Sequence, residues 1–446
     1  MKLITRQLLI ILISLITSVN VAATSDQRIL ITNVNVFNGK DNELGLNRNI
    51  FIEGNIIKAV DVQVVDNAGA YDLVIDGRAG TLMPGLIDTH THLSFVGPLD
   101  KLVDWSWDYI GVLMNERAEA TLMRGFTTIR DMGGQVMGLK QAIDQGLISG
   151  PRIYPSGAFL TQTGGHADLR DWTDLNPRWS SHSTNLERLG FYRTTDGVAD
   201  VLAATRENLA HGATQIKIMA SGGMGSHFDP LDSIQFTAGE MQAAVEAAEN
   251  WDTYVSAHVQ NGRAIFETLK AGIMSIEHGN GIDEKGMKLL VKKGAFLNTH
   301  FASPRIALEH TKQNDYLKSK AQEVIDQTGE MIRLIRKYNP KLTYCTDAAG
   351  AAWIWEKKHS AELLDRAKIF AAPDILRQAT SAAAELLALS NNRNPYPGKL
   401  GVIEQAALAD LIIVKGNILE DVSVLAKPEN NILFIMKDGV IYKNIL

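Results

Sequence analysis

Two histidines separated by a single residue, His90 and His92, end a short apolar segment. Side chains two apart on a β-strand point to the same face, so both imidazoles are expected on one side. Paired imidazoles suit a borderline metal ion such as zinc. The pair alone only suggests a metal site, because a histidine at a strand end is more often a hydrogen-bonded structural residue.

Four more candidate metal ligands stand at later strand ends: Lys217, His258, His278 and Asp347. Each has an alternative interpretation, since Lys217 can be a core lysine whose ammonium reaches a rim and Asp347 can cap the next helix. Chance would rarely place all of them at strand ends around one mouth. Together they predict a metal-dependent enzyme. The rival from another class is a non-catalytic binding protein, which would be expected to lack some of these ligands.

The segments that carry these residues alternate short apolar strands with helices, which is typical of a parallel sheet. Helices are expected over 237–251, 263–271 and 373–389, the first with a capping box. Eight strands are expected, at 82–92, 127–131, 152–156, 215–220, 254–258, 275–278, 296–300 and 342–347. This alternation predicts an α/β fold, a (β/α)8 TIM barrel over 81–391, with catalytic groups at the carboxyl ends of its strands.

Both ends of the chain are rich in short β-like segments separated by turns such as Asn38-Gly39 and Asp438-Gly439. Because chain ends often lie close together, residues 24–80 and 392–446 are expected to form one small β-sandwich. Within the barrel, the stretch 161–195 lacks periodicity and is expected to be a lid or substrate loop.

The first 23 residues have the layout of a secretory signal peptide, with basic residues, an apolar run over 8–16 and the small residues Val21-Ala22-Ala23. A membrane anchor is the alternative, but the run is shorter than the roughly 20 residues that span a bilayer. Cleavage removes two of the 44 basic residues and leaves 50 acidic ones, a net charge of −8, which does not favour a nucleic-acid partner. We therefore expect a secreted or periplasmic protein without stable membrane insertion; whether it forms a homo-oligomer stays open.

The segment Pro84-Gly85-Leu86-Ile87-Asp88-Thr89-His90-Thr91-His92 resembles the strand-one signature of the amidohydrolase superfamily. Ala409-Asp410-Leu411-Ile412-Ile413 and Lys437-Asp438-Gly439 resemble its C-terminal β-domain. The residues around Lys217, with Gly164-Gly165-His166 upstream, resemble the branch that holds Xaa-Pro dipeptidases and related carboxypeptidases, to which imidazolonepropionase-related proteins are neighbours. The resemblance spans nearly the whole mature chain.

The resemblance implies a site for two divalent ions, expected to be Zn2+. It implies that an N6-carboxylated Lys217 bridges both ions, since a buried lysine with a lowered pKa is a neutral amine able to react with CO2. Asp347 would take a proton from the attacking water and deliver it to the leaving nitrogen. The implied ligands are His90, His92 and Asp347 for the inner ion, and His258 and His278 for the outer ion.

Three further residues are candidates for contact with a small-molecule substrate. The resemblance places His166 near the substrate carbonyl as a donor; a structural loop histidine is the alternative. Arg170 would pair with a substrate carboxylate, and His300 would line the pocket at the end of the seventh strand; a purely structural role is the alternative for each. The expected reaction is cleavage of the amide C–N bond of a dipeptide or N-acyl amino acid.

Two departures from the resembling branch leave dipeptide specificity open. Ala167 follows His166 where relatives often have glycine, and no tyrosine follows His258 closely, where dipeptidase relatives often carry one. Lactone or organophosphate hydrolysis on the same dimetal site also stays open, as does an imidazolonepropionase-like cyclic amide hydrolase. A mononuclear deaminase is less favoured, because no acid follows His258 until Glu267. The one cysteine, Cys345, cannot form an internal disulfide and is expected to pack rather than react.

Overall fold

The structure is a computed structural model that describes residues 27–446, except 62–68, 181, 227 and 311–313. The expected signal peptide, 1–23, lies outside the described residues and stays a prediction, as do the domain boundaries. Within the described part of the chain, no helix combines the length and apolar character needed to cross a bilayer.

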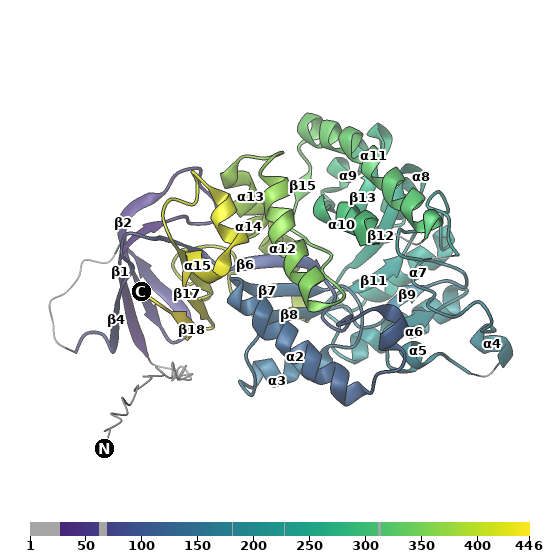
Figure 1. The fold of residues 1–446 in the computed structure, drawn as a ribbon, viewed down its shortest axis with the longest axis horizontal. Coiled ribbons are helices and arrows are strands. Elements are labelled where there is room, and N and C mark those ends of the chain that lie inside the picture. The colour runs from purple at the N-terminus through teal and green to yellow at the C-terminus, as the bar shows by residue number, and fades with distance from the viewer. Residues whose placement is uncertain (1–26, 62–68, 181, 227, 311–313) are drawn as a thin grey trace, which may run out of the picture.

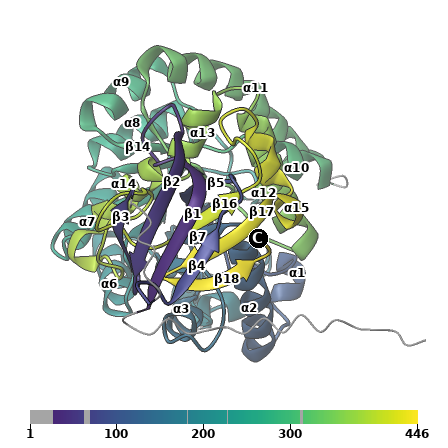
Figure 2. The same ribbon diagram turned by 90° about the vertical axis from the view of Figure 1, so that its left-hand side faces the viewer.

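Strands from both chain ends form one eight-stranded sheet, in the order β18-β17-β16-β5-β1-β2-β3, with β4 paired to β1. Figure 2 shows the N-terminal and C-terminal strands side by side. Ile31 and Ile50 share a buried cluster with Ile413 and Phe434, which confirms a β domain built from both termini. The strands are β1 Arg28–Val36, β2 Gly45–Glu53, β3 Ile56–Val60, β4 Leu73–Asp76, β5 Thr81–Pro84, β16 Leu411–Val414, β17 Ile432–Lys437 and β18 Val440–Asn444.

Parallel strands in two sheets form the barrel. Thr214 N donates to Pro155 O on one side and His92 N donates to Ala348 O on the other, so hydrogen bonds join the two sheets into a ring. This agrees with the predicted (β/α)8 architecture, to which the short parallel strands β9 and β10 are additional. The first sheet contains β6 Leu86–Thr91, β7 Phe126–Asp131 and β8 Arg152–Pro155. The second contains β9 Phe159–Thr161, β10 Tyr192–Thr194, β11 Ile216–Met219, β12 Val255–Asn261, β13 Ser275–Gly281, β14 Phe296–Asn298 and β15 Lys341–Leu342.

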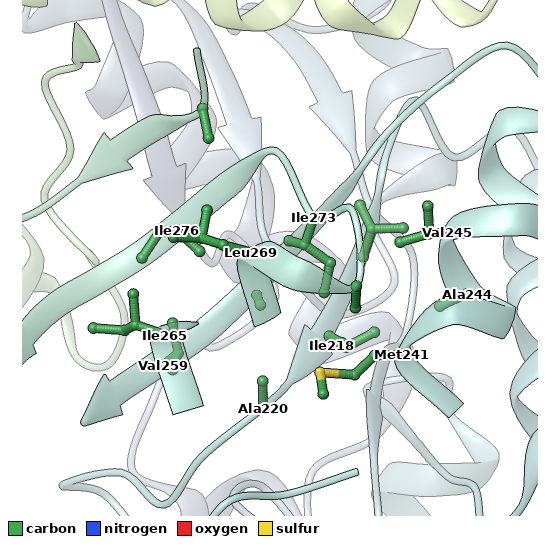
Figure 3. Close-up of a cluster of buried hydrophobic side chains, with 14 of the residues drawn as sticks. Ile218, Ala220, Met241, Ala244, Val245, Val259, Ile265, Leu269, Ile273 and Ile276 are labelled. Carbon is green, nitrogen blue, oxygen red and sulfur yellow. The ribbon is translucent and has the colours of Figure 1, made fainter. Parts of the chain in front are cut away.

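Helices surround the barrel strands (Figure 1). The expected capping box of Thr237 and Glu240 is present at the start of α7. Met241 of α7 and Leu269 of α8 lie in one buried cluster with Ile218 of β11 and Ile276 of β13 (Figure 3). The main helices are α1 Leu99–Leu102, α2 Trp107–Met123, α3 Met137–Asp144, α6 Val198–Ala210, α7 Ala238–Glu249, α8 Gly262–Lys270, α9 Glu284–Lys293, α10 Ala302–His310, α11 Asp315–Tyr338, α12 Ala352–Arg366, α13 Ala372–Gln378 and α14 Ser381–Leu387.

The prediction of one strand over 82–92 is wrong, because this stretch is two strands in two different sheets. β5 pairs with β16 in the β domain, and β6 pairs with β7 in the barrel. Gly85 separates them, and a Cβ atom at Gly85 would lie 2.1 Å from Thr127 Oγ1. The close approach of the Thr127 side chain therefore requires glycine at this position, and the chain changes sheet there.

Two other expected elements also differ. The helix expected over 373–389 is α13 and α14, because Thr380 between them has non-helical backbone angles, φ −137° and ψ −96°. The stretch 161–195 is partly regular, since it holds the short helices α4 Pro177–Ser180 and α5 Asn185–Arg188 and ends in β10. Its return to β9 through β10 anchors the stretch beside the barrel mouth.

An ion-pair cluster around the buried Arg152 joins the barrel to the β domain. Arg152, at the start of β8, donates from Nε to Asp410 Oδ2 at 2.6 Å and from Nη2 to Asp438 Oδ1 at 2.7 Å. These two aspartates belong to the C-terminal motifs that the sequence analysis identified. Their role is to tie the β domain to the amino-terminal end of the barrel strands, opposite the predicted site.

Candidate metal centre

The six predicted metal ligands lie around one cavity of about 300 Å3. They come from five strand ends that are far apart in the sequence. The Nε2 atoms of His90 and His92 lie 3.6 and 3.4 Å from Asp347 Oδ1. The residues that the structure brings together are His90 of β6, His92 directly after β6, Lys217 of β11, His258 of β12, His278 of β13, and Asp347 beyond β15.

The imidazoles at the centre are packed ring against ring. The ring centroids of His258 and His278 are 4.4 Å apart, and those of His90 and His278 are 5.0 Å apart. Two groups of three have ligand atoms within 4.8 Å of one another, and Asp347 belongs to both. The first group, His90, His92 and Asp347, is the set expected for the inner ion. The second group is His278, His300 and Asp347; it contains His278 of the set expected for the outer ion, but His300 in place of His258.

The charge states of these groups suit a divalent cation. Burial lowers the pKa of His90 to about 3, and burial also lowers the pKa of His278 well below its ordinary value, so both rings are neutral. Burial raises the pKa of Asp347, but Lys358 and the nearby imidazoles outweigh it and hold the pKa of this carboxyl well below its usual range. Neutral imidazoles beside a carboxylate are the donor set that zinc and similar ions take in proteins.

One atom in the site lacks a partner that a bound ion would provide. His90 Nε2 is buried and has no hydrogen-bond partner among the described residues. A buried nitrogen without a partner costs about 1–3 kcal/mol and calls for an explanation. Its position next to Asp347 Oδ1 makes coordination of a cation the explanation that fits the residues present.

Lys217 is 1% exposed and lies in the wall of the cavity. Burial is the main cause that lowers the pKa of its amine to about 8. The neutral amine is therefore populated near neutral pH, far more than for an exposed lysine. This is the form that reacts with CO2, so the environment of Lys217 suits a carbamate.

Two of the candidate ligands have an unusual backbone. His278 has φ +67° and Asp347 has φ +51°, in the left-handed region that non-glycine residues rarely adopt. Such strain costs about 1–3 kcal/mol and tends to occur at functional sites. At Asp347 the backbone is held by its N–H, which donates to His90 O at 2.8 Å.

Glu277 supports the site but was not among the predicted residues. Its Oε2 lies 2.9 Å from His90 Nδ1, and Arg130 Nη2 donates to its Oε1 at 2.7 Å. Burial raises the pKa of Glu277, but Arg130 outweighs burial and keeps the carboxylate ionised. An ionised Glu277 accepts a hydrogen bond from the Nδ1–H group of His90, which leaves Nε2 without a proton and able to bind a metal ion. The only sequence signal is an acid directly before the strand-six histidine.

His166 lies in the cavity wall with its ring stacked on His258 at a centroid distance of 4.1 Å. Its Nδ1 is 2.7 Å from Ser226 Oγ and 3.3 Å from Asp229 Oδ2. Lys320 Nζ in turn donates to the backbone oxygens of Ser226 and Asp229. The ring is therefore held from behind by a loop that the sequence analysis did not identify.

The other two predicted substrate contacts lie outside the wall of this cavity. Arg170 makes a two-pronged ion pair with Asp168, through Nε to Oδ1 at 2.8 Å and through Nη2 to Oδ2 at 2.5 Å. His300 is buried behind His278, with its Nε2 2.7 Å from His278 Nδ1. These contacts favour a role for Arg170 in the loop and for His300 in orienting His278.

Two residues beside Asp347 were missed by the sequence analysis. Ser303 Oγ donates to Asp347 Oδ2 at 3.2 Å, and Lys358 Nζ lies 3.8 Å from the same oxygen. Both come from helices after the barrel strands, where no motif singles them out. Cys345 is buried, its Sγ is 3.1 Å from Thr299 O, and burial raises the pKa of its thiol, which suits packing.

Comparison with protein-family models gives one match, the amidohydrolase family, over residues 81–442. The chain belongs to the amidohydrolase family. The predicted resemblance is thereby confirmed, and the matched region runs from the strand before the His90–His92 pair into the last strand of the β domain.

Known proteins similar to this amidohydrolase include an ochratoxinase, a prolidase and a Xaa-Pro dipeptidase. Ochratoxinase of Aspergillus niger is 30% identical over 387 residues, which cover 82% of this chain and 76% of ochratoxinase. A prolidase solved with N-methylphosphonate-L-proline has a TM-score of 0.86 at 33% identity, covering 94% of this chain and all of that one. A Xaa-Pro dipeptidase solved with methionine in its active site has a TM-score of 0.82 at 29% identity, with the same coverage. This amidohydrolase is therefore an enzyme, a hydrolase of carbon–nitrogen bonds.

Glu277→Gln is expected to weaken the binding of added zinc at the candidate ligands about 10- to 100-fold, because the neutral amide no longer orients His90 as the carboxylate does. Competition with a chelator of known affinity measures the effect. Glu385→Gln, at an exposed glutamate that pairs with Lys341, is the matched control and should bind zinc like the original protein. Equal affinity in both variants would show that Glu277 does not support the ligand.

Proposed function

We propose that this amidohydrolase is metal-dependent and hydrolyses the amide bond of a dipeptide or an N-acyl amino acid. The observation that carries the proposal is the convergence of six candidate ligands on one cavity, with neutral imidazoles, an ionised Asp347 and a lysine of lowered pKa. Its similarity to a prolidase, a Xaa-Pro dipeptidase and ochratoxinase supports an amide substrate.

The residues present would hold two divalent ions, with zinc as the proposed metal. Once bound, such ions lower the pKa of a water molecule toward neutrality and polarise the scissile carbonyl. A carboxylated Lys217 would add one negative charge to the residues that hold them. The proposed holders are His90, His92 and Asp347 for one ion and His258 and His278 for the other, with Lys217 shared.

The chain itself supplies proton transfer and orientation. Asp347 accepts a proton from the attacking water at a carboxylate oxygen and delivers it to the leaving nitrogen. Ser303 donates to Asp347 Oδ2 and so limits the positions of the carboxylate. His166, held by Ser226 and Asp229, faces the cavity where it can donate a hydrogen bond to the carbonyl oxygen as charge develops there.

The proposal is tested by metal analysis followed by a substrate panel. We expect about two zinc ions per chain and hydrolysis of N-acetyl amino acids or dipeptides that is lost on chelation and restored by zinc. The same panel includes a lactone, an organophosphate triester and aminopyrimidines. One ion per chain with deamination would replace the proposal by a mononuclear deaminase. Turnover of only the lactone or the triester would replace it by the corresponding hydrolase.

A further inference from the structure

A second cavity, of about 220 Å3, adjoins the cavity that the six candidate ligands line, which we call the metal cavity. His92 and His166 line both cavities, together with Met219 and Gly225. A substrate whose scissile amide lies between these two histidines would therefore place a neighbouring group in the second cavity. We call it the apolar pocket, because the rest of its wall is formed by Phe95, Leu99, Phe159, Ala167, Leu169 and Ala349, along with Ser226.

Aromatic rings form the rigid side of the apolar pocket. The rings of Phe95 and Phe159 are stacked, with centroids 6.0 Å apart and an angle of 20° between their planes. Behind them, Phe159 stacks on Tyr192 and Phe95 meets Phe191 edge to face at 5.1 Å. Tyr192 and Phe191 are completely buried, so these rings are held by packing and the pocket is preformed. A preformed pocket requires little ordering when a ligand enters.

Two polar groups of this wall, His166 Nδ1 and Ser226 Oγ, are already bonded to protein partners. His166 Nδ1 and Ser226 Oγ are 2.7 Å apart, and both lie in contact with Asp229. Arg170, next to Leu169 in the chain, is tied to Asp168. A polar substrate group entering the pocket would lose its bonds to water without replacement, whereas an apolar group would gain from leaving water.

The size of the apolar pocket suits a ring. A cavity of about 150 Å3 lined by leucine, isoleucine and phenylalanine is large enough to bind benzene. At about 220 Å3, the apolar pocket has room for a phenyl group with its methylene carbon. A glycine at this position of the substrate would leave it unfilled, and an alanine would fill only a small part of it.

We propose that the apolar pocket binds an aromatic or large aliphatic side chain next to the scissile amide. This inference rests on the proposed amide hydrolysis and names the substrate class within it. The preferred substrates are then N-acyl amino acids or dipeptides that carry phenylalanine or leucine. Phenylalanine should be preferred over tyrosine, because the side chains of Phe95, Phe159 and Leu169 offer no hydrogen-bond partner to a tyrosine hydroxyl.

The test compares kcat/KM of the zinc-loaded enzyme for N-acetyl derivatives of glycine, alanine, leucine, tyrosine and phenylalanine, and for dipeptides with phenylalanine on either side. The phenylalanine substrate is expected to exceed the glycine substrate about 10- to 100-fold. Leu99→Trp fills the pocket from α1 and should remove most of this preference, because it lowers kcat/KM for the phenylalanine substrate far more than for the glycine substrate. Val103→Trp is the matched control, since Leu99 and Val103 are both 39% exposed and Val103 lies outside the pocket wall.

A binding measurement separates this inference from the proposed function. Calorimetry with L-phenylalanine and L-alanine on the zinc-loaded protein, before and after Leu99→Trp, needs no turnover. Tighter binding of phenylalanine that Leu99→Trp weakens supports the pocket, even if no amide is hydrolysed, in which case only the proposed function fails. Equal kcat/KM for glycine and phenylalanine substrates, or an equal loss for both in Leu99→Trp, overturns the assignment of the pocket.

Discussion

Lys217→Ala is expected to lower turnover roughly 100-fold or more and to remove most of the bound metal, since even residues that only orient metal ligands are worth 10- to 100-fold. The amine is buried in the cavity wall, and its lowered pKa suits carboxylation. Truncation to alanine opens space next to the ligands, so added acetate or propionate should enter it and restore part of the activity. Metal content by mass spectrometry and kcat/KM with and without the acid measure the two effects.

Lys217→Met is the matched control for this rescue. Methionine removes the amine but keeps most of the bulk of the side chain, so metal and activity should fall as in the alanine variant while short acids find no room. Rescue of the alanine variant alone would identify the missing group as a carboxylate at this point of the cavity. Full activity of Lys217→Ala without added acid would refute the bridging role.

Asp347→Asn is expected to lower kcat by about 10²- to 10⁴-fold, which is the usual contribution of a positioned general acid or base. The amide has nearly the same shape as the carboxylate, but it cannot accept the proton of the attacking water. In the original protein Lys358 and the imidazoles lower the pKa of this carboxyl despite its burial, so it is ionised at neutral pH and ready to accept that proton. Steady-state kinetics with metal held in excess separates this effect from loss of metal.

Ser303→Ala provides the comparison for Asp347→Asn. It removes only the 3.2 Å hydrogen bond to Asp347 Oδ2, so the carboxylate keeps its charge and loses one restraint. Its kcat should fall much less than that of the asparagine variant. A kcat for Asp347→Asn within a few-fold of the original protein, at full metal occupancy, would exclude Asp347 as the proton carrier.

Most of the barrel could be predicted from local patterns. The strands expected at 127–131, 152–156 and 275–278 correspond to β7, β8 and β13, and Thr237 caps its helix as expected. Strand and helix periods repeat over a few residues and can be read within one segment. The candidate ligands could be predicted for a related reason: parallel strands in a barrel end at one face, so side chains at strand ends converge.

The elements that were wrong depend on contacts from outside their own segment. Nothing within 82–92 reveals that the chain leaves the β domain at Gly85, because the reason is the approach of Thr127. His278 stays a predicted ligand, but nothing in its own segment reveals its contact with His300, which lies beyond β14. Contacts such as these form between segments that are far apart in the sequence, so no pattern within one segment predicts them.

By itself the sequence determined the class of fold, the family and the set of candidate ligands, because residue type and short spacing decide which way a side chain faces on a strand. Only the tertiary structure decided which residues contact the candidate site residues. Glu277 and Arg130, 147 residues apart, lie behind His90, and Asp168 pairs with Arg170. The tertiary structure also decided that the apolar pocket lies beside the metal cavity. The physical reason is that hydrogen bonds and packing act over a few ångströms of space, whatever the separation along the chain.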